Sequence, residues 1–120
     1  MTTVVNEFVR FVHLAPAETL ARTGEALRRV GFAAETHGGD HLVASRGERP
    51  APTPDLVPLR VEAWVVADGD GAVLRLRAAD GAANVLTGPV RRNYERLVHQ
   101  LELDVDAALA EASSGLSPTR

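Results

Sequence analysis

The sequence contains neither cysteine nor lysine. The lack of cysteine excludes disulfides, thiolate metal sites and cysteine nucleophiles, and it leaves the redox compartment undetermined. All 13 basic side chains are arginine. Schiff-base chemistry and the phosphate-binding lysine of P-loop enzymes are therefore excluded.

Aromatic residues, net charge and long apolar runs are also scarce. Aromatic residues make up 4% of the chain, and the formal net charge is -3. That charge gives no long-range attraction to nucleic acid or anionic lipid, so we do not expect a nucleic-acid partner. Asn6, Glu7 and Arg10 interrupt the first apolar run, which predicts neither a signal peptide nor a membrane span. We expect a soluble, cytoplasmic protein with no membrane partner.

The composition is that of one ordinary globular domain. The chain has 120 residues, of which 45% are hydrophobic and 24% charged. This length buries a core without disulfides or metals. We expect a single domain over residues 1–112 and a disordered tail over residues 113–120.

The first third of the chain predicts a strand followed by a helix. Residues 4–14 are rich in β-branched and aromatic side chains, which favours a strand. Pro16 suits the first turn of a helix, and Gly31 suits its end. The expected apolar face of this helix comprises Leu20, Ala21, Gly24, Leu27 and Val30. Two i,i+4 ion pairs are expected on its outer face, Glu18 with Arg22 and Glu25 with Arg29.

Two hairpins follow. The first is expected over residues 32–46 with Gly38 and Gly39 as a two-residue turn, which places His37 and His41 on opposite faces. Residues 47–56 are expected to form a proline-spaced, extended connection. The second hairpin is expected over residues 59–79 with Gly69 and Asp70 at the turn. One face then pairs Val65 with Leu74, Ala63 with Leu76 and Val61 with Ala78; the other pairs Trp64 with Arg75 and Glu62 with Arg77.

A long amphipathic helix ends the predicted fold. Thr87-Gly88-Pro89 is a helix start, and apolar residues then recur at steps of three and four. The stripe comprises Val90, Tyr94, Leu97, Val98, Leu101, Val105, Ala108, Leu109 and Ala112. We predict an α+β domain of order β-α-β-β-β-β-α, with a five-stranded antiparallel sheet and both helices on one face.

This order of elements resembles the TATA-box-binding-protein-like fold. It equally resembles the helix-grip proteins, which include lipid-transfer START domains, polyketide cyclases and the birch pollen allergen family. The resemblance covers nearly the whole chain and rests on element order. No family motif is matched, so no catalytic residue is carried over.

Two segments contain metal-ligand side chains. His37, Asp40 and His41 are close in sequence, but we expect a turn flanked by solvated polar residues rather than a metal site. Residues 68–71 (Asp-Gly-Asp-Gly) begin like a calcium loop, yet the further acidic ligands do not follow. We therefore expect no metal and no cofactor.

The last helix breaks a local rule. Arg91 and Arg92 occupy its first turn, while its second half carries Glu102, Asp104, Asp106 and Glu111, which the helix macrodipole disfavours. Two guanidinium groups beside free backbone donors would suit a phosphate or carboxylate. The alternative is that both arginines pair with acidic neighbours such as Asp80 or Glu95.

The outward face of the second hairpin is the main candidate site. It carries the only tryptophan among arginines, a combination enriched at interface hot spots. Its residues are Arg60, Glu62, Trp64, Val66, Val73, Arg75 and Arg77. The alternative is a solvated sheet face with one sheltered indole.

Two classes of function follow. The first is a non-enzymatic interaction module that homodimerises or binds a protein partner through this open face. The second is a small-molecule binder or helix-grip-like enzyme with a pocket between the sheet and the last helix, for an anionic or apolar ligand. Its candidate lining residues are Tyr94, His99 and His13. No set of acid, base and nucleophile is visible, which favours the non-enzymatic class.

Overall fold

The computed structural model describes residues 4–47, 57–80 and 88–115. Its elements, in chain order, are β1 (Val4–Val12), α1 (Pro16–Arg29), β2 (Ala33–His37), β3 (His41–Arg46), β4 (Leu59–Asp68), β5 (Gly71–Asp80) and α2 (Gly88–Gly115). The predicted order β-α-β-β-β-β-α is confirmed. Most of the predicted proline-spaced connection lies outside the described residues. Within the described ranges, no helix has the length and apolarity to cross a membrane.

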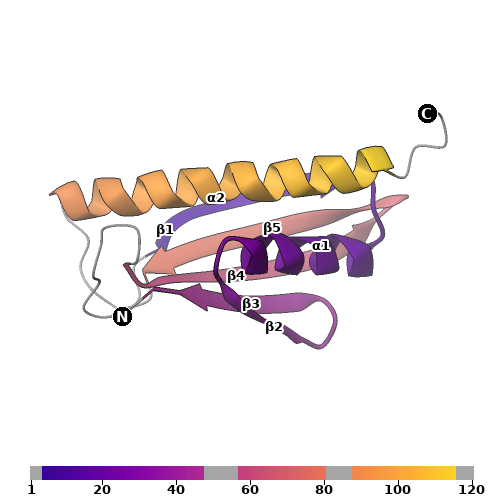
Figure 1. The fold of residues 1–120 in the computed structure, drawn as a ribbon. Coiled ribbons are helices and arrows are strands. Elements are labelled where there is room, and N and C mark those ends of the chain that lie inside the picture. Colours follow the sequence, from indigo (N-terminus) through magenta and orange to yellow (C-terminus); the bar gives the residue numbers. More distant parts are fainter. Residues whose placement is uncertain (1–3, 48–56, 81–87, 116–120) are drawn as a thin grey trace.

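The five strands form one antiparallel sheet in the order β1-β5-β4-β3-β2. Strands β1 and β2 are consecutive in the chain but lie at opposite edges of the sheet, so α1 carries the chain from one edge to the other (Figure 1). The pairs β2–β3, β3–β4 and β4–β5 each join strands that are consecutive in sequence. The β1–β5 pairing is therefore the long-range contact that completes the sheet.

Both helices cover the same face of this sheet, with α2 running along its length (Figure 1). One continuous core fills the space between the layers. The inward residues of the sheet alternate along each strand, as the period of a strand requires. The most deeply buried large side chains include Leu27 from α1, Leu42, Leu59, Val61, Leu74 and Leu76 from the sheet, and Val98 and Val105 from α2.

Helix α1 begins at Pro16, as predicted, and both predicted ion pairs form. The buried face of α1 differs from the prediction, because Ala21 is exposed whereas Thr19, Thr23 and Ala26 are buried. A buried hydroxyl needs a hydrogen-bond partner. Both threonine hydroxyls find one by donating to the backbone carbonyl four residues earlier, at 3.0 Å and 2.8 Å.

The register of the second hairpin is confirmed. All five predicted cross-strand pairs occur, and the turn is centred on Gly69 and Asp70. Leu59, Val61, Ala63 and Val65 point into the core from β4. Neither of the two described helices packs on the opposite side of the hairpin.

The first hairpin differs from the prediction by one residue. Its turn spans residues 38–40, so His37 pairs with His41 and both lie on the same face. The two-residue turn that we expected would have paired Ala33 with the buried Ala44 and turned Ala34 outward. In the observed register Ala34 pairs with Ala44 and packs against the core, while Glu35 and Thr36 are both exposed. The longer turn therefore gives β2 its contact with the core.

Helix α2 confirms the predicted stripe except at Val90, which is 51% exposed, and it continues to Gly115. Residues 116–120 of the predicted tail lie outside the described residues. The acidic residues in the second half of α2 have a tertiary role. Arg10 on β1 donates to Asp106 at 3.1 Å and lies 3.9 Å from Glu102, so these carboxylates tie the helix to the edge strand.

Gly71 sets how closely β1 and β5 approach at the end of the sheet. A Cβ atom there would lie 2.2 Å from the Val12 carbonyl oxygen and 2.9 Å from the Phe11 ring. We predict that Gly71→Ala destabilises the fold by about 3 kcal/mol, because the backbone carbonyl of Val12 cannot move away without disturbing the β1–β5 pairing. Urea denaturation followed by tryptophan fluorescence measures this loss.

Gly69→Ala in the same hairpin is the matched control. Gly69 has a positive φ of 59°, but nothing lies within 4 Å of an added Cβ. Gly69→Ala should therefore lower the free energy of unfolding only by the cost of a positive φ for alanine, roughly 1–2 kcal/mol. A loss for Gly71→Ala no larger than that for Gly69→Ala would contradict the close approach.

Candidate functional site

The side of the sheet opposite the helices, called here the outer face, carries every residue that the sequence proposed for an interface. Arg60, Glu62 and Trp64 project from β4, and Arg75 and Arg77 from β5. Strand β1 adds Glu7, Val9 and Phe11 through its pairing with β5. Hairpin-based prediction missed these three, because β1 is distant in sequence from β5.

Apolar side chains gather at one end of the outer face. Val66, Val73 and Phe11 form one cross-strand row, and Trp64 and Val9 belong to the next. These five residues are called the apolar patch. Val66, Val9 and Phe11 are 66%, 54% and 48% exposed, and the patch borders a shallow hollow of about 460 Å³. The described residues leave this apolar surface uncovered.

Charged side chains of both signs occupy the other end of the outer face. Arg75 donates to Glu7 at 3.1 Å, and Arg60 lies 3.9 Å from Glu62. Glu62 also lies 3.0 Å from the Nε2 atom of His41. The register predicted for Glu62 and Arg77 is correct, but the partner of Glu62 is the histidine of the next strand.

Trp64 stacks on His41 rather than under Arg75. The two rings are nearly parallel, with centroids 5.1 Å apart and an interplanar angle of 10°. His37 continues the row, with its ring centroid 5.7 Å from that of His41. This ladder follows from the three-residue turn, which puts both histidines on the outer face. Among the described residues no group of three or more side chains is arranged to hold a metal ion.

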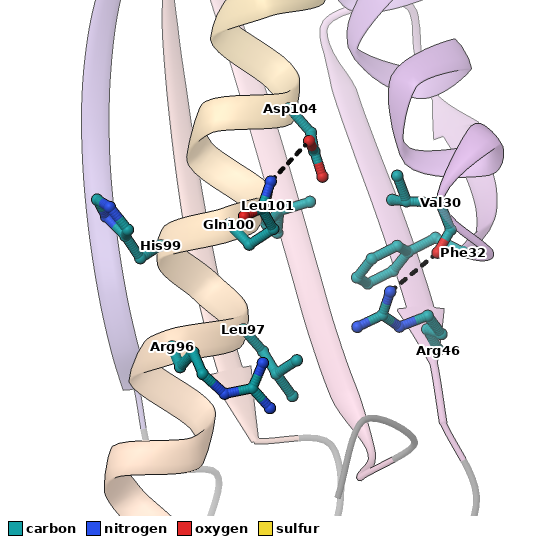
Figure 2. A pocket seen from close by; sticks show the side chains of 9 residues that line it. All are labelled: Val30, Phe32, Arg46, Arg96, Leu97, His99, Gln100, Leu101 and Asp104. Carbon is teal, nitrogen blue, oxygen red and sulfur yellow. Dashed lines mark hydrogen bonds between the residues drawn. The ribbon is translucent and has the colours of Figure 1, made fainter.

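The three pocket residues proposed from the sequence do not share a site. Tyr94 is buried in the core, where its hydroxyl donates to the Pro58 carbonyl at 2.8 Å. His13 is exposed beyond the end of β1, 3.9 Å from Asp70. His99 lies on α2, with its ring directed away from Phe32 (Figure 2). The three residues therefore do not line one pocket, and of them only His99 lines the cavity described next.

A different cavity lies between α2 and the segment that joins α1 to the sheet. We call it the α2 groove; it has a volume of about 460 Å³. Its lining comprises Val30, Phe32, Arg46, Arg96, Leu97, His99, Gln100, Leu101 and Asp104 (Figure 2). This volume is within the range of small-molecule sites. The sequence signal that could have pointed to it is Arg46, a cation at the end of a strand whose alternate residues are buried.

Arg91 and Arg92 lie in the first turn of α2, the former partly exposed and the latter exposed. The residues directly before the helix lie outside the described residues. The anion-binding role of these two arginines stays a prediction.

Two solved structures are similar to this chain at low identity. CalU16 from Micromonospora echinospora is 12% identical, with 91% of this chain and 80% of that chain covered and a TM-score of 0.47. TTHA0849 from Thermus thermophilus is 15% identical, with 89% and 97% covered and a TM-score of 0.46. No protein-family model matches the chain, and a comparison with curated proteins finds no match. The fold therefore rests on the strand order and packing described above.

The hydroxyl of Tyr94 lies in a buried site that changes its acidity. Burial, and secondarily the negative charge of Asp80, raise the pKa of the Tyr94 hydroxyl above its usual value of 10.0. The unfolded chain then loses this proton at lower pH than the folded chain. We predict that stability present below about pH 10 falls as pH rises further, through the folded-state pKa.

Because Tyr94 is the only tyrosine, tyrosinate absorbance reports it alone. The measurement is a urea denaturation series from about pH 8 to pH 11 on the wild type and Tyr94→Phe. The variant should be about 1 kcal/mol less stable at neutral pH through loss of the bond to Pro58. It should also lose less stability than the wild type on going to high pH; equal pH dependence would contradict the burial of an ionisable hydroxyl.

Proposed function

We propose that this protein is a non-enzymatic interaction module that forms a homodimer through the outer face. The observation that supports this proposal is the apolar patch, with three large apolar side chains about half or more exposed beside Trp64. Isolated exposed apolar residues are normal on a monomer, but a contiguous set around an aromatic residue marks an interaction site.

A second copy of the chain is the occupant that the charges favour. The charged end of the outer face carries both acidic and basic groups, including Glu7 and Glu62 beside Arg60, Arg75 and Arg77. A two-fold axis brings the same surface onto itself, so a face with both signs complements its own copy. Nucleic acid would instead require a predominantly basic face.

The dimensions of the outer face also fit a dimer. From the strand lengths, its flat projection is roughly 600 Å² at the usual strand rise and spacing. A standard interface buries about 800 Å² of accessible surface on each partner, which a corrugated face of this size supplies. The apolar patch would form the apolar part of this interface and the charged groups at the other end its polar part.

Val66→Asp tests the dimer. An unpaired carboxylate in the apolar part of a buried interface costs about 3 kcal/mol or more, so we predict that the dimer dissociation constant rises at least about 100-fold. Sedimentation equilibrium or light scattering over a concentration series measures it. Trp64→Ala should weaken the dimer as well, because it removes the largest aromatic side chain of the apolar patch.

Val90→Asp is the matched control, because Val90 is also an exposed valine but lies on α2, away from the outer face. Its dissociation constant should equal that of the wild type. A wild-type protein that stays monomeric at all concentrations would reject the proposal. Equal weakening by Val66→Asp and Val90→Asp would reject the outer face as the interface.

A second candidate function is the binding of a small molecule in the α2 groove. The observation in its favour is the volume of about 460 Å³ with apolar side chains on both walls, Phe32 and Val30 on one and Leu97 and Leu101 on the other. Such a groove encloses the apolar body of a small ligand. The groove and the outer face lie on different sides of the sheet, so the two functions are independent.

A further inference from the structure

Arg46 is held rigidly at one wall of the α2 groove. Its Nη1 atom donates to the Val30 carbonyl at 2.9 Å, and its guanidinium carbon lies 4.8 Å from the centre of the Phe32 ring. The hydrogen bond and the stacking fix the plane of the guanidinium group. A cation that is already oriented loses little conformational freedom when it binds a ligand.

The same guanidinium has an unfilled donor. The Nε atom of Arg46 is buried and has no hydrogen-bond acceptor among the described residues. A guanidinium nitrogen forms a strong, charge-assisted hydrogen bond with a carboxylate oxygen. Because Nη1 donates to Val30 and Nε is buried, Nη2 is the nitrogen left to a ligand in the groove. The unfilled Nε donor leaves the positive charge of this guanidinium only partly compensated by protein acceptors.

The opposite wall of the groove is apolar near Arg46 and polar farther along α2. Leu97 and Leu101 face the space beside the Arg46 guanidinium, while Gln100 and Asp104 lie together on the next turn (Figure 2). The side-chain amide of Gln100 donates to the Asp104 carboxylate at 3.1 Å, so a hydrogen bond partly compensates the negative charge of Asp104. Arg96 adds a second cation to the lining, so the groove as a whole is basic even though the chain is acidic.

We infer that the α2 groove binds a small organic carboxylate whose apolar or aromatic body packs between Phe32 and Leu101 and whose carboxylate is received by Arg46. This inference rests on the second proposed function, ligand binding in the groove, and adds the chemical class of the ligand. The flat Phe32 ring and the leucine wall select the body. The Arg46 guanidinium selects the charge.

Two probes of the same shape separate these contributions. We would titrate the wild type with 2-naphthoate and with its neutral analogue 2-naphthamide, by calorimetry and by amide chemical shifts. The naphthoate should bind about tenfold to a hundredfold more tightly than the amide, as expected for a hydrogen-bonded charge pair. The shifted amides should be those of α2 and of residues 30–32 and 46.

Three variants locate the effect. Arg46→Gln should weaken naphthoate binding to the level of naphthamide and leave naphthamide unchanged. Arg60→Gln removes an arginine from the outer face and should change neither affinity. Gln100→Trp places a large side chain in the groove without touching Arg46 and should abolish binding of both probes. Thermal denaturation checks that each variant is folded. If Arg46→Gln proves poorly folded, Gln100→Trp still tests whether the probes bind in the groove.

The possible outcomes distinguish the two proposals. Equal affinity for naphthoate and naphthamide, or no effect of a folded Arg46→Gln, would overturn the carboxylate specificity while the groove still binds ligands. No binding of either probe, or unaltered binding in Gln100→Trp, would overturn ligand binding in the groove itself. Tighter naphthoate binding that is lost in both Arg46→Gln and Gln100→Trp supports both.

Discussion

The apolar contact between the inner side of the β4–β5 hairpin and the helices determines the rest of the molecule. Val61, Leu74 and Leu76 are completely buried in this contact. Each large apolar side chain contributes about 1.5–3 kcal/mol when it is buried, against about 0.2–1 kcal/mol for a cross-strand pair on the surface. Successive side chains of a strand alternate between faces, so burial of this set obliges Trp64 and Val66 to point outward. The outer face is a consequence of the core.

The edge strand β1 completes the outer face and also anchors α2. Its outward residues Val9 and Phe11 extend the apolar patch, while its inward residue Arg10 reaches the helix carboxylates. The macrodipole acts mainly on the last turn of a helix, and α2 continues to Gly115, so Glu102 and Asp106 lie too far from that end to lose much by it. Their partly exposed ion pairs with Arg10 contribute a modest stabilisation. These acidic residues thus have a structural role that needs no ligand.

The outer face and the α2 groove share no lining residue, and the sheet separates them. A dimer through the outer face therefore leaves the groove of each copy open to solvent. Ligand binding and self-association are compatible in one molecule, and each responds to substitutions that do not touch the other. The two histidines beside Trp64 belong to the outer face only, and Arg46 belongs to the α2 groove only.

Local patterns in the sequence were sufficient for the elements and for the second hairpin. The alternation over β4 and β5 and the short turn between them determine that register, and the apolar stripe of α2 determines which side of the helix is buried. The first hairpin was predicted one residue out of register because two adjacent glycines permit a turn of two or three residues. The packing of Ala34 against the core, opposite the buried Ala44, accompanies the longer turn.

The sequence by itself determined the absence of cysteine and lysine chemistry, the order of the elements and the outward direction of Trp64, because these depend on composition and on short-range periodicity. Only the tertiary structure decided that β1 lies beside β5, that His41 stacks on Trp64, and that Arg46 meets the wall of α2. Each of these contacts joins residues of different elements, and no local spacing specifies which distant element fills the remaining edge or covers the remaining space.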